Sequence, residues 1–455
     1  MWEHPPGGHG GSAEAPGGGL TCRELTASRN ILPGITPSDY RHIDYFSQVC
    51  HNVSVINGLS ISELKRCSMK KFFKWLGIAL GIFLLGILLL LAYWYFRPNR
   101  AQVNKDIVTE TWPIADNNMH NSNTDMIEWN GETYIAYVTS PYHFSSEAST
   151  LHIKHSPDHG RTWVEDSSFN PDKNDIRDPK FAVIGKRLFL YALDNNSFNP
   201  EPYQTVYSYT EDGKDWSPLK VVPGVDGWLF WRPKTQDGKT FYNSAYWFEH
   251  GRAALLKSTD GINWEVVSII NEGERNDETE IIFLPDNRLL ATARLEYDES
   301  WLEGTLGDKR GSTLITVSTP PYTKWTELAQ SKVTRLDGPY LFPYNGRVYA
   351  IGRYQPDLGR SGPLTDEGSA LAKKRTALFE VREDGLAYLT DLPSDGDTSY
   401  VGLVQDSDTA YASYYTSPLN HDYGWIMGMF LPTQVRIAKI DLKAMEALAD
   451  KTRSK

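Results

Sequence analysis

Short apolar runs, separated by pairs such as Asn-Gly and Asp-Gly, recur along the chain from about residue 104. The first two runs are Asp125-Met-Ile-Glu-Trp and Thr133-Tyr-Ile-Ala-Tyr137, and Asn130-Gly131 joins them. Two such runs around an Asn-Gly pair predict a β-hairpin, because both turn positions of the tightest hairpins require positive φ. Five similar patterns follow, and they begin at Asp178, Arg232, Glu280, Pro339 and Tyr400. The polar and apolar pattern therefore predicts six hairpins.

A second pattern, Ser-x-Asp-x-Gly-x-Thr-Trp, lies at 156–163 and returns in shorter form at 210–216 and 258–264. Weaker copies lie at 318–325 and 383–388. We expect the Asp to accept backbone amide hydrogens, the Gly to adopt positive φ, and the Trp to pack between strands. The final aromatic residues are 48 to 63 residues apart, a spacing typical of propeller blades of four strands each. The predicted fold class is all-β, a six-bladed β-propeller.

The sixth hairpin is followed by only one more strand-like run, Val435–Ile440. We predict that the missing outer strand of this blade comes from the other end of the domain, near Ile107–Thr111. Closing the ring in this way pairs sheet edges that would otherwise be open to aggregation. The propeller is expected to span residues 99–441, and residues 442–455 are expected to form a short helical tail.

One apolar segment is long enough to cross a membrane as a helix. Residues 75–96 are 22 positions without a charge, with aromatic residues at both ends. Five Lys or Arg residues precede the segment closely and two follow it, so the positive-inside rule puts the N-terminus in the cytoplasm. The propeller would then lie on the periplasmic, extracellular or luminal side. No Ala-x-Ala site follows, which favours an uncleaved signal-anchor at 69–98 over a signal peptide.

The residues before this anchor have a different character. Residues 5–20 are rich in Gly and Pro and cannot form a core, so residues 1–68 are predicted to be disordered. Met69-Lys-Lys followed by an apolar run is a usual beginning for a bacterial signal-anchor. We therefore hypothesise that residues 1–68 are an upstream extension that does not belong to the natural product.

Composition excludes some functions. The net charge of −11 and the lack of a basic stripe argue against nucleic acid as a partner. All three Cys residues precede the anchor, and no spacing of His and Cys suggests zinc, so no metal and no cofactor are predicted. The 14 Trp and 25 Tyr residues suit an all-β fold and a sugar-facing surface. The predicted partners are a glycan and, through the anchor, a membrane.

The innermost strands of a propeller run parallel along its axis, so the residues that begin them converge. Here these residues are rich in carboxylates and arginines, which are costly to bury unless they pair or serve a function. Hydrolysis of a glycosidic bond needs a carboxylic acid and a second group that acts as base or nucleophile. The catalytic candidates are Asp125, Asp178, Glu278 and, as a phenol nucleophile, Tyr400. The alternative is structural, because an Asp at a strand start caps a turn and Arg–Asp pairs lock blades together.

Other side chains are candidates for holding the substrate. Arginine binds a carboxylate through paired hydrogen bonds. An aromatic residue beside an arginine can stack on a sugar ring, although core packing is an equal alternative. A lone His on a loop is more often a hydrogen-bonding group than a metal ligand, and His120 and His143 flank the first hairpin. The substrate-binding candidates are Arg177, Arg232, Arg294, Arg353, Trp231 and His120.

Several longer motifs carry a resemblance to a known family: His120-Asn121…Thr124-Asp125, Ile176-Arg-Asp-Pro-Lys180, Trp231-Arg232, Asp277-Glu278, Thr319-Pro-Pro-Tyr-Thr323 with Trp325, Asp337-Gly-Pro339, and Leu392-Pro-Ser-x-Gly-Asp-Thr-Ser-Tyr400. Together with the Asp-containing turns, they resemble the Asp-box repeats and strand motifs of a bacterial exo-α-sialidase-like family of the sialidase superfamily. The resemblance covers roughly residues 117–441. It implies a six-bladed propeller that acts on sugars.

The resemblance also implies roles for individual residues. Glu278, Arg294, Arg353 and Tyr400 fall in the order in which sialidases place their glutamate, second arginine, third arginine and tyrosine. The Arg-Ile-Pro segment that gives sialidases their first arginine is absent before the first Asp-containing turn. Asp125, Asp178 and Glu278 also resemble the three-carboxylate plan of five-bladed furanosidases, so the nucleophile stays open.

Three functions are consistent with the sequence. The first is a membrane-anchored, sialidase-like glycoside hydrolase that cleaves a terminal, acidic sugar from a glycan. The second is a carbohydrate-binding propeller without catalysis, which the missing Arg-Ile-Pro segment favours. The third is a polysaccharide lyase, in which Tyr or His removes a proton beside a uronate carboxylate that Arg neutralises.

Overall fold

The structure is a computed structural model that describes residues 61–171, 174–195, 204–297, 306–331, 334–356 and 366–454. Residues 1–68 were expected to be a disordered extension; residues 1–60 of it lie outside the described residues, and residues 61–68 belong to a helix. The chain forms two compact units, Met1–Gly86 and Ile87–Lys455, and the second contains the propeller.

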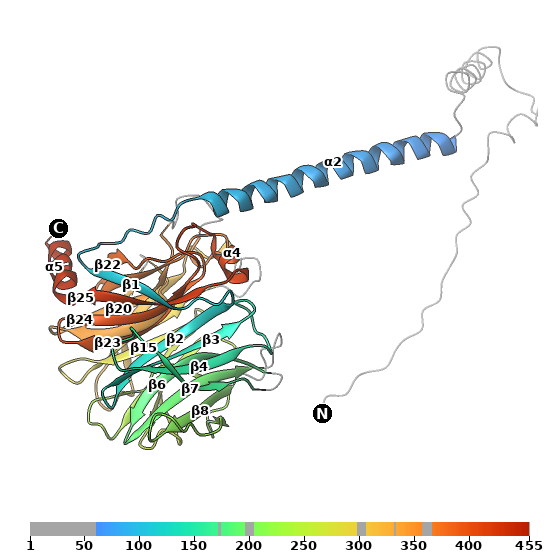
Figure 1. Ribbon diagram of the computed structural model, residues 1–455. Helices are drawn as coiled ribbons and strands as arrows, with labels where there is room; N and C mark the ends of the chain where they lie inside the picture. The colour runs from blue at the N-terminus through green and yellow to red at the C-terminus, as the bar shows by residue number, and fades with distance from the viewer. Residues whose placement is uncertain are drawn as a thin grey trace, which may run out of the picture. The chain divides into compact units, whose positions relative to one another are not determined.

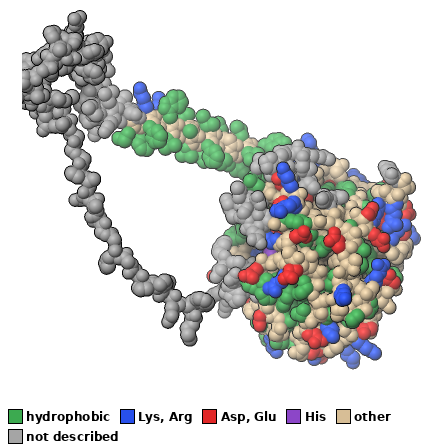
Figure 2. Space-filling view, turned by 180° about the vertical axis from the view of Figure 1, so that it is seen from behind, with side chains coloured by type: hydrophobic (Ala, Val, Ile, Leu, Met, Phe, Trp, Pro, Cys, Tyr) green, Lys and Arg blue, Asp and Glu red, His purple; other side chains and the backbone are tan. Residues whose placement is uncertain are grey.

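The helix α2 spans Ile61–Phe96 and contains an apolar stretch of 25 residues, Met69–Tyr93. This stretch is long and apolar enough to cross a membrane. None of it is buried, and Figure 2 shows hydrophobic side chains covering the helix. The helix begins at Ile61, ahead of the expected start at Met69, because adding turns to an existing helix is easier than nucleating one.

Six antiparallel sheets follow, so the predicted six-bladed propeller is confirmed (Figure 1). The first three blades consist of β2 (His120–Trp129), β3 (Glu132–Ser140), β4 (Thr150–Ser156) and β5 (Val164–Phe169); β6 (Asp175–Ile184), β7 (Arg187–Asn195), β8 (Gln204–Thr210) and β9 (Lys220–Val221); and β10 (Trp228–Phe230), β11 (Lys234–Thr235), β12 (Phe241–Trp247), β13 (Arg252–Ser258) and β14 (Glu265–Glu272). In the third blade Pro233 lies between β10 and β11, and its missing N–H explains why the inner strand is divided.

The last three blades complete the ring. They consist of β15 (Asn276–Phe283), β16 (Leu289–Leu295), β17 (Ser312–Ser318) and β18 (Trp325–Ser331); β19 (Asp337–Tyr344), β20 (Arg347–Tyr354), β21 (Arg375–Arg382) and β22 (Gly385–Asp391); and β23 (Thr398–Asp406), β24 (Thr409–Thr416), β25 (Gln434–Asp441) and β1 (Val108–Ala115). As predicted, β1 pairs with β25, and Figure 1 shows it beside the last strands of the chain. The short helix α4 (Trp425–Phe430) precedes β25, and α5 (Leu442–Arg453) follows it.

The hydrophobic core lies between neighbouring blades. One cluster joins Phe342 and Tyr349 of blade 5 to Tyr414 of blade 6 and Met445 of α5. Another joins blades 1 and 2. Each blade is therefore buried on both faces by its neighbours, which explains why the inner strands are apolar along most of their length.

The three Asp-containing turns have the expected local bonds. Asp158 Oδ1 accepts the amide hydrogens of Arg161 and Thr162 at 3.0 and 2.8 Å, and Gly160 donates to Ser156 Oγ at 2.7 Å. The turns at Asp212 and Asp260 repeat this arrangement. These bonds hold the pKa of both Asp158 and Asp260 at about 2.

Candidate active site

One irregularity is repeated in the innermost strand pair of five blades. Two residues of the inner strand oppose one residue of its neighbour at 123–124, 178–179, 277–278, 338–339 and 400–401. Such β-bulges turn side chains out of the regular alternation and are common beside active sites. The residue opposite the bulge in blade 4 is Arg294, so this arginine faces Asp277 and Glu278. The sequence motifs therefore mark the bulges.

The first bulge residue has a left-handed backbone in four blades. The φ angles of Asn123, Asp178, Gly338 and Tyr400 are 53°, 52°, 58° and 50°. For a residue other than glycine this conformation costs on the order of 1–3 kcal/mol, and it persists only where the surrounding structure enforces it. The four left-handed residues, three of them strained and one a glycine, come from four different blades and occupy equivalent positions. This repetition indicates that the bulges serve a site at the start of the inner strands.

The bulges of blades 4 and 6 bring Glu278 and Tyr400 together. The Tyr400 hydroxyl donates a short hydrogen bond to Glu278 Oε1, although the residues are 122 positions apart. Glu278 Oε2 accepts the amide hydrogen of Gly338 at 2.6 Å and lies 3.2 Å from Arg294 Nη1. Burial, followed by the charges of Glu278 and Asp178, raises the pKa of Tyr400 well above its ordinary value. The phenol is therefore neutral at rest, with a carboxylate positioned to take its proton.

Asp337 gathers three guanidinium groups beside this pair. Its carboxylate lies 3.2 Å from Arg294, 2.8 Å from Arg335 and 3.1 Å from Arg353. Burial alone would raise the pKa of Asp337, but the three positive charges outweigh it and hold the pKa well below its usual range. The sequence predicted Arg294 and Arg353 here but missed Arg335, whose signal was its position two residues before Asp337.

Asp178 lies near the Tyr400–Glu278 pair. Asn123 donates a short hydrogen bond to it, and only 6% of the residue is exposed. Burial raises its pKa above the usual value, while Lys180 and Arg177 oppose the rise. Burial and the charge of Arg232 lower the pKa of Lys180 itself to about 8. Asp178 thus holds a proton more readily than an ordinary carboxyl group does.

Three other predicted site residues, Asp125, Arg232 and Trp231, make contacts that join one blade to another. Asp125 accepts from the amide of Phe181 at 2.7 Å and from Arg232 Nε at 2.8 Å. Arg232 also donates to Glu280 at 2.6 Å and to backbone carbonyls of blades 5 and 6. Trp231 is 1% exposed, and its Nε1 donates to the carbonyl of Pro339 at 3.1 Å. These contacts match the structural alternative, in which charged pairs lock blades together.

His120 and Arg177 lie at the starts of blades 1 and 2. His120 is fully buried, and its Nε2 lies 3.0 Å from Asp397 Oδ2. Burial, the largest cause, lowers the pKa of His120. Arg177 Nε lies 2.5 Å from Asp175, and its side chain is 21% exposed. His143, on the loop after β3, also contacts Asp397 Oδ2, at 2.7 Å.

In the part of the chain that the structure describes, two groups have ligand atoms close enough to hold a metal ion. They are His120, His143 and Asp397, and His250, Asp277 and Glu296. Arg353 lies 3.5 Å from Asp397, and Arg294, Arg335 and Arg275 all contact Glu296. A cation at either place would have to compete with guanidinium groups for the same carboxylate. Ion pairs and hydrogen bonds therefore explain both clusters.

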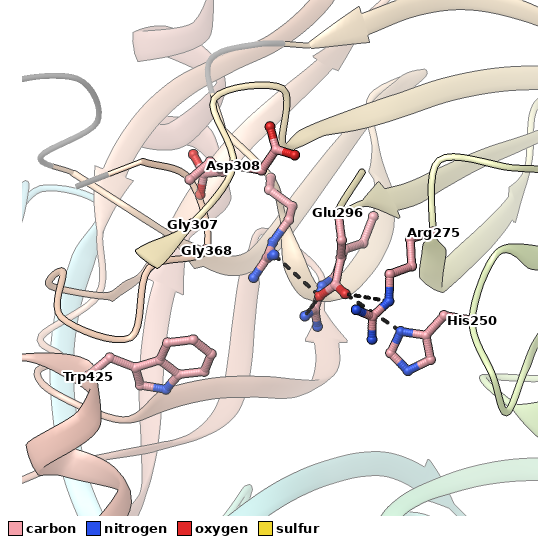
Figure 3. A pocket seen from close by; sticks show the side chains of 10 residues that line it. His250, Arg275, Glu296, Gly307, Asp308, Gly368 and Trp425 are labelled. Carbon is pink, nitrogen blue, oxygen red and sulfur yellow. Dashed lines mark hydrogen bonds and ion pairs between the residues drawn. The ribbon is translucent and has the colours of Figure 1, made fainter. Parts of the chain in front are cut away.

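A pocket of about 240 Å³ opens beside Arg294 and Arg335 (Figure 3). Its wall consists of His250, Arg275, Arg294, Glu296, Gly307, Asp308, Arg335, Glu367, Gly368 and Trp425. Figure 3 shows Trp425 on the opposite side of the pocket from His250 and Arg275. Glu367 and Lys374 are both buried, and burial raises the pKa of the Glu367 carboxyl and lowers that of the Lys374 amine. The pocket thus offers several positive donors, carboxylate acceptors and one aromatic face.

The structure brings some of the predicted residues together and separates others. Glu278, Tyr400, Arg294 and Arg353 belong to one network of hydrogen bonds and ion pairs, which His120 joins through Asp397, and the charge of Asp178 acts on Tyr400. Asp125, Arg232 and Trp231 are instead held among the inner strands, and Arg177 pairs with Asp175. Sequence reasoning missed Arg335, Glu296, Glu367 and Trp425. The last three lie on connections or strand ends without a repeated motif, so the repeat pattern carried no signal for them.

Comparison with solved structures shows the same fold. A protein of unknown function from Dyadobacter fermentans matches with TM-score 0.54 and 15% identity, over 73% of this chain and 98% of that one. The phage phi92 endosialidase matches with TM-score 0.53 and 12% identity, over 73% and 69% of the two chains. The Trypanosoma rangeli sialidase matches with TM-score 0.50 and 11% identity, over 78% of this chain and 61% of that one.

Sequence comparison finds no matching family model and no matching curated protein. The sequence identities with the solved structures are too low to transfer an activity to this chain. The solved structures share with this chain the arrangement of the blades. The fold of this chain is therefore a sialidase-like, six-bladed β-propeller.

Proposed function

We propose that this protein is a glycoside hydrolase that removes a terminal, acidic sugar from a glycan. The observation that carries this proposal is the hydrogen bond from Tyr400 to Glu278 beside the arginines gathered at Asp337. A tyrosine held on a carboxylate is an activated nucleophile, because the carboxylate accepts the phenol proton as the oxygen attacks. The sialidase-like fold of the neighbours is consistent with this chemistry.

In the proposed reaction, Tyr400 Oη attacks the anomeric carbon and transfers its proton to Glu278. The carboxylate is ready for this role because Gly338 and Arg294 hold its other oxygen. The left-handed backbone of Tyr400 keeps the phenol at the start of the inner strand. Neutral tyrosine suits a negatively charged substrate, since a phenolate would repel it.

The pocket is suited to an acidic, polyhydroxylated sugar. Arg275, Arg294 and Arg335 provide guanidinium donors for a substrate carboxylate, and Asp308 and Glu296 provide acceptors for sugar hydroxyls. Trp425 provides an apolar face for a ring. The pocket volume of about 240 Å³ suits one sugar unit better than a long chain, which favours a sugar at the end of a glycan.

The apolar stretch of α2 is proposed to anchor the protein in a membrane, with residues 1–68 on the cytoplasmic side and the propeller, 99–441, on the opposite side. The excess of Lys and Arg before the stretch supports this orientation. Protease treatment of intact membrane vesicles of known sidedness tests it. Digestion of the propeller from the cytoplasmic side would refute the orientation.

The test of activity uses the full chain in detergent micelles with p-nitrophenyl and methyl α-sialosides and a panel of other acidic glycosides. Tyr400→Phe removes the nucleophile and is expected to lower kcat/KM by about 10²–10⁴-fold. Tyr344→Phe is the matched control, because Tyr344 Oη also donates to a carboxylate, Asp408, at 2.8 Å, but on a hairpin away from the pocket. The control should keep wild-type activity.

Other outcomes support the alternatives. Glycan binding without turnover in the wild type would refute the hydrolase and support a binding propeller. A product with new absorbance from a conjugated, unsaturated uronate would support a lyase.

A further inference from the structure

We infer that His143, held by Asp397, is the general acid and base of the proposed hydrolysis. This inference rests on the proposed function and adds a residue from blade 1, where the Arg-Ile-Pro segment of sialidases is missing. Sequence analysis left Asp125, Asp178 and Glu278 as candidate carboxyl groups without assigning the acid and the base, and the structure gives a reason to prefer the histidine for that role.

The position of His143 is fixed at both its backbone and its side chain. Its amide donates to the carbonyl of Met429 in α4 at 2.8 Å, which ties the loop after β3 to the helix that carries Trp425. Its Nδ1 lies 2.7 Å from Asp397 Oδ2. A loop residue anchored in this way can act with little reorganisation.

The Asp397 contact also selects the tautomer. Because the carboxylate accepts the hydrogen on Nδ1, the remaining nitrogen, Nε2, is the one free to gain and lose a proton. In the described part of the chain Nε2 has no hydrogen-bond partner, and 23% of the side chain is exposed. His120 contacts the same carboxylate oxygen but is fully buried, so it cannot reach a substrate.

Asp397 is itself rigidly oriented. Tyr415 Oη and Trp425 Nε1 donate to its Oδ1 at 3.1 and 2.8 Å, and Arg353 lies 3.5 Å away. Burial opposes ionisation, but His143 and His120 outweigh it and keep the pKa of Asp397 well below its usual range. Asp397 therefore faces His143 as a carboxylate and orients its ring through Nδ1.

The His143–Asp397 pair and the proposed nucleophile, Tyr400, lie near the same guanidinium group, that of Arg353. The Cζ atom of Arg353 lies 5.9 Å from the centre of the Tyr400 ring, and its Nη1 contacts Asp397. The Tyr415 ring, whose hydroxyl binds Asp397, lies 6.3 Å from the Tyr400 ring. Asp178 is 6% exposed and bound by Asn123, so its proton is less accessible than that of His143.

Tyr400 Oη bonds to the anomeric carbon as the bond to the leaving oxygen breaks. Glu278 takes the phenol proton, and the leaving oxygen keeps the electron pair and takes the proton on His143 Nε2. Water then attacks the anomeric carbon and gives a proton to His143 Nε2. The carbon–oxygen bond to Tyr400 breaks, and its oxygen recovers the proton from Glu278.

The experiment compares two substrates with the same sugar and different leaving groups, the p-nitrophenyl and methyl α-sialosides. His143→Ala is expected to lower the glycosylation rate on the methyl sialoside by about 10²–10⁴-fold, because a poor leaving group needs the acid. Glycosylation by the nitrophenyl sialoside should change much less. Azide, which needs no general base, should speed turnover of the nitrophenyl substrate by His143→Ala and give a glycosyl azide.

The pH profile is a second readout. Wild-type kcat/KM on the methyl sialoside should decrease at alkaline pH, where a general acid no longer carries its proton, and this decrease should be absent in His143→Ala. The charged or titratable groups beside the ring are Asp397 and His120; Arg353 contacts Asp397, and Arg177 acts on His120. None of them is altered in this variant. His152→Ala is the matched control, since His152 Nδ1 lies 2.9 Å from Glu165 on the surface of blade 1.

The outcomes separate the two proposals. If the wild type is active and His143→Ala lowers the glycosylation rate by the same factor on both substrates, the role of His143 is refuted and the proposed function is not. Selective loss on the methyl sialoside in Asp178→Asn, with His143→Ala unaffected, would transfer the role to Asp178. A wild type that hydrolyses no glycoside refutes the proposed function and this inference with it.

Discussion

Asp337 is the residue whose removal should disturb the buried charge network most. Asp337 is 2% exposed, and its carboxylate faces the guanidinium groups of Arg294, Arg335 and Arg353. Asp337→Asn keeps the shape of the side chain but leaves three buried positive charges without this partner. Glu278, Glu296 and Asp397 compensate part of that charge.

Breaking a buried ion pair costs about 3–5 kcal/mol, because the remaining charge stays desolvated. The propeller between β1 and α5 has roughly 350 residues, for which the unfolding entropy is about 0.7 kcal/mol per kelvin. The variant should therefore melt about 4–7 °C below the wild type. Tryptophan fluorescence of the full chain in detergent, at one fixed heating rate, measures the shift.

The matched control is Asp286→Asn, because Asp286 and Arg288 form an exposed pair at 2.8 Å in the hairpin of blade 4. Such a surface pair contributes at most about 1 kcal/mol, so the melting temperature of Asp286→Asn should lie no more than about 1–2 °C below that of the wild type. The lowered pKa of Asp337 means that its contribution is complete above the ordinary carboxyl pKa and is lost as pH falls toward the folded value. The shift should therefore be constant between about pH 5 and pH 8. Equal shifts in the two variants would refute the reasoning.

Two further substitutions test how the blades pack. Gly213 and Gly131 both have positive φ, but a Cβ on Gly213 would collide with the Tyr134 hydroxyl, whereas one on Gly131 meets nothing within 4 Å. Gly213→Ala should therefore cost about 1–3 kcal/mol more than Gly131→Ala in thermal unfolding, and equal costs would show that the turn of blade 2 does not pack against blade 1. Trp231→Ala should cost about 3–5 kcal/mol of stability as a core substitution, with a smaller loss for half-buried Trp228→Ala. If Trp231→Ala instead weakens substrate binding at unchanged stability, Trp231 is a sugar-binding residue.

The sequence indicated the fold because its signals are local. Asn130-Gly131 and its counterparts specify hairpins through their own backbone preferences, and the Ser-x-Asp-x-Gly turns form their hydrogen bonds within a few residues. The count of six hairpins with one strand missing was enough to predict that β1 closes the last blade. The hairpins and turns depend on neighbours along the chain, and the closure by β1 follows from their number.

The roles of the charged residues were decided by contacts between distant segments. Sequence analysis gave Arg232 and Arg294 the same substrate-binding role, yet Arg232 is locked to Asp125 and Glu280, whereas Arg294 contacts Glu278 and lines the pocket. Nothing local to either arginine shows this difference. The same is true of His143, whose partner Asp397 lies 254 positions away.

What the sequence determined by itself was therefore the architecture: the apolar helix, the hairpins, the number of blades and the end of the propeller where acidic and basic groups gather. Only the tertiary structure decided which of those groups meet. The physical reason is that turns and burial patterns follow from adjacent residues, whereas ion pairs and proton transfer depend on distances of about 3 Å between blades. Those distances are set by bulges and left-handed residues such as Tyr400, which regular strand alternation does not foresee.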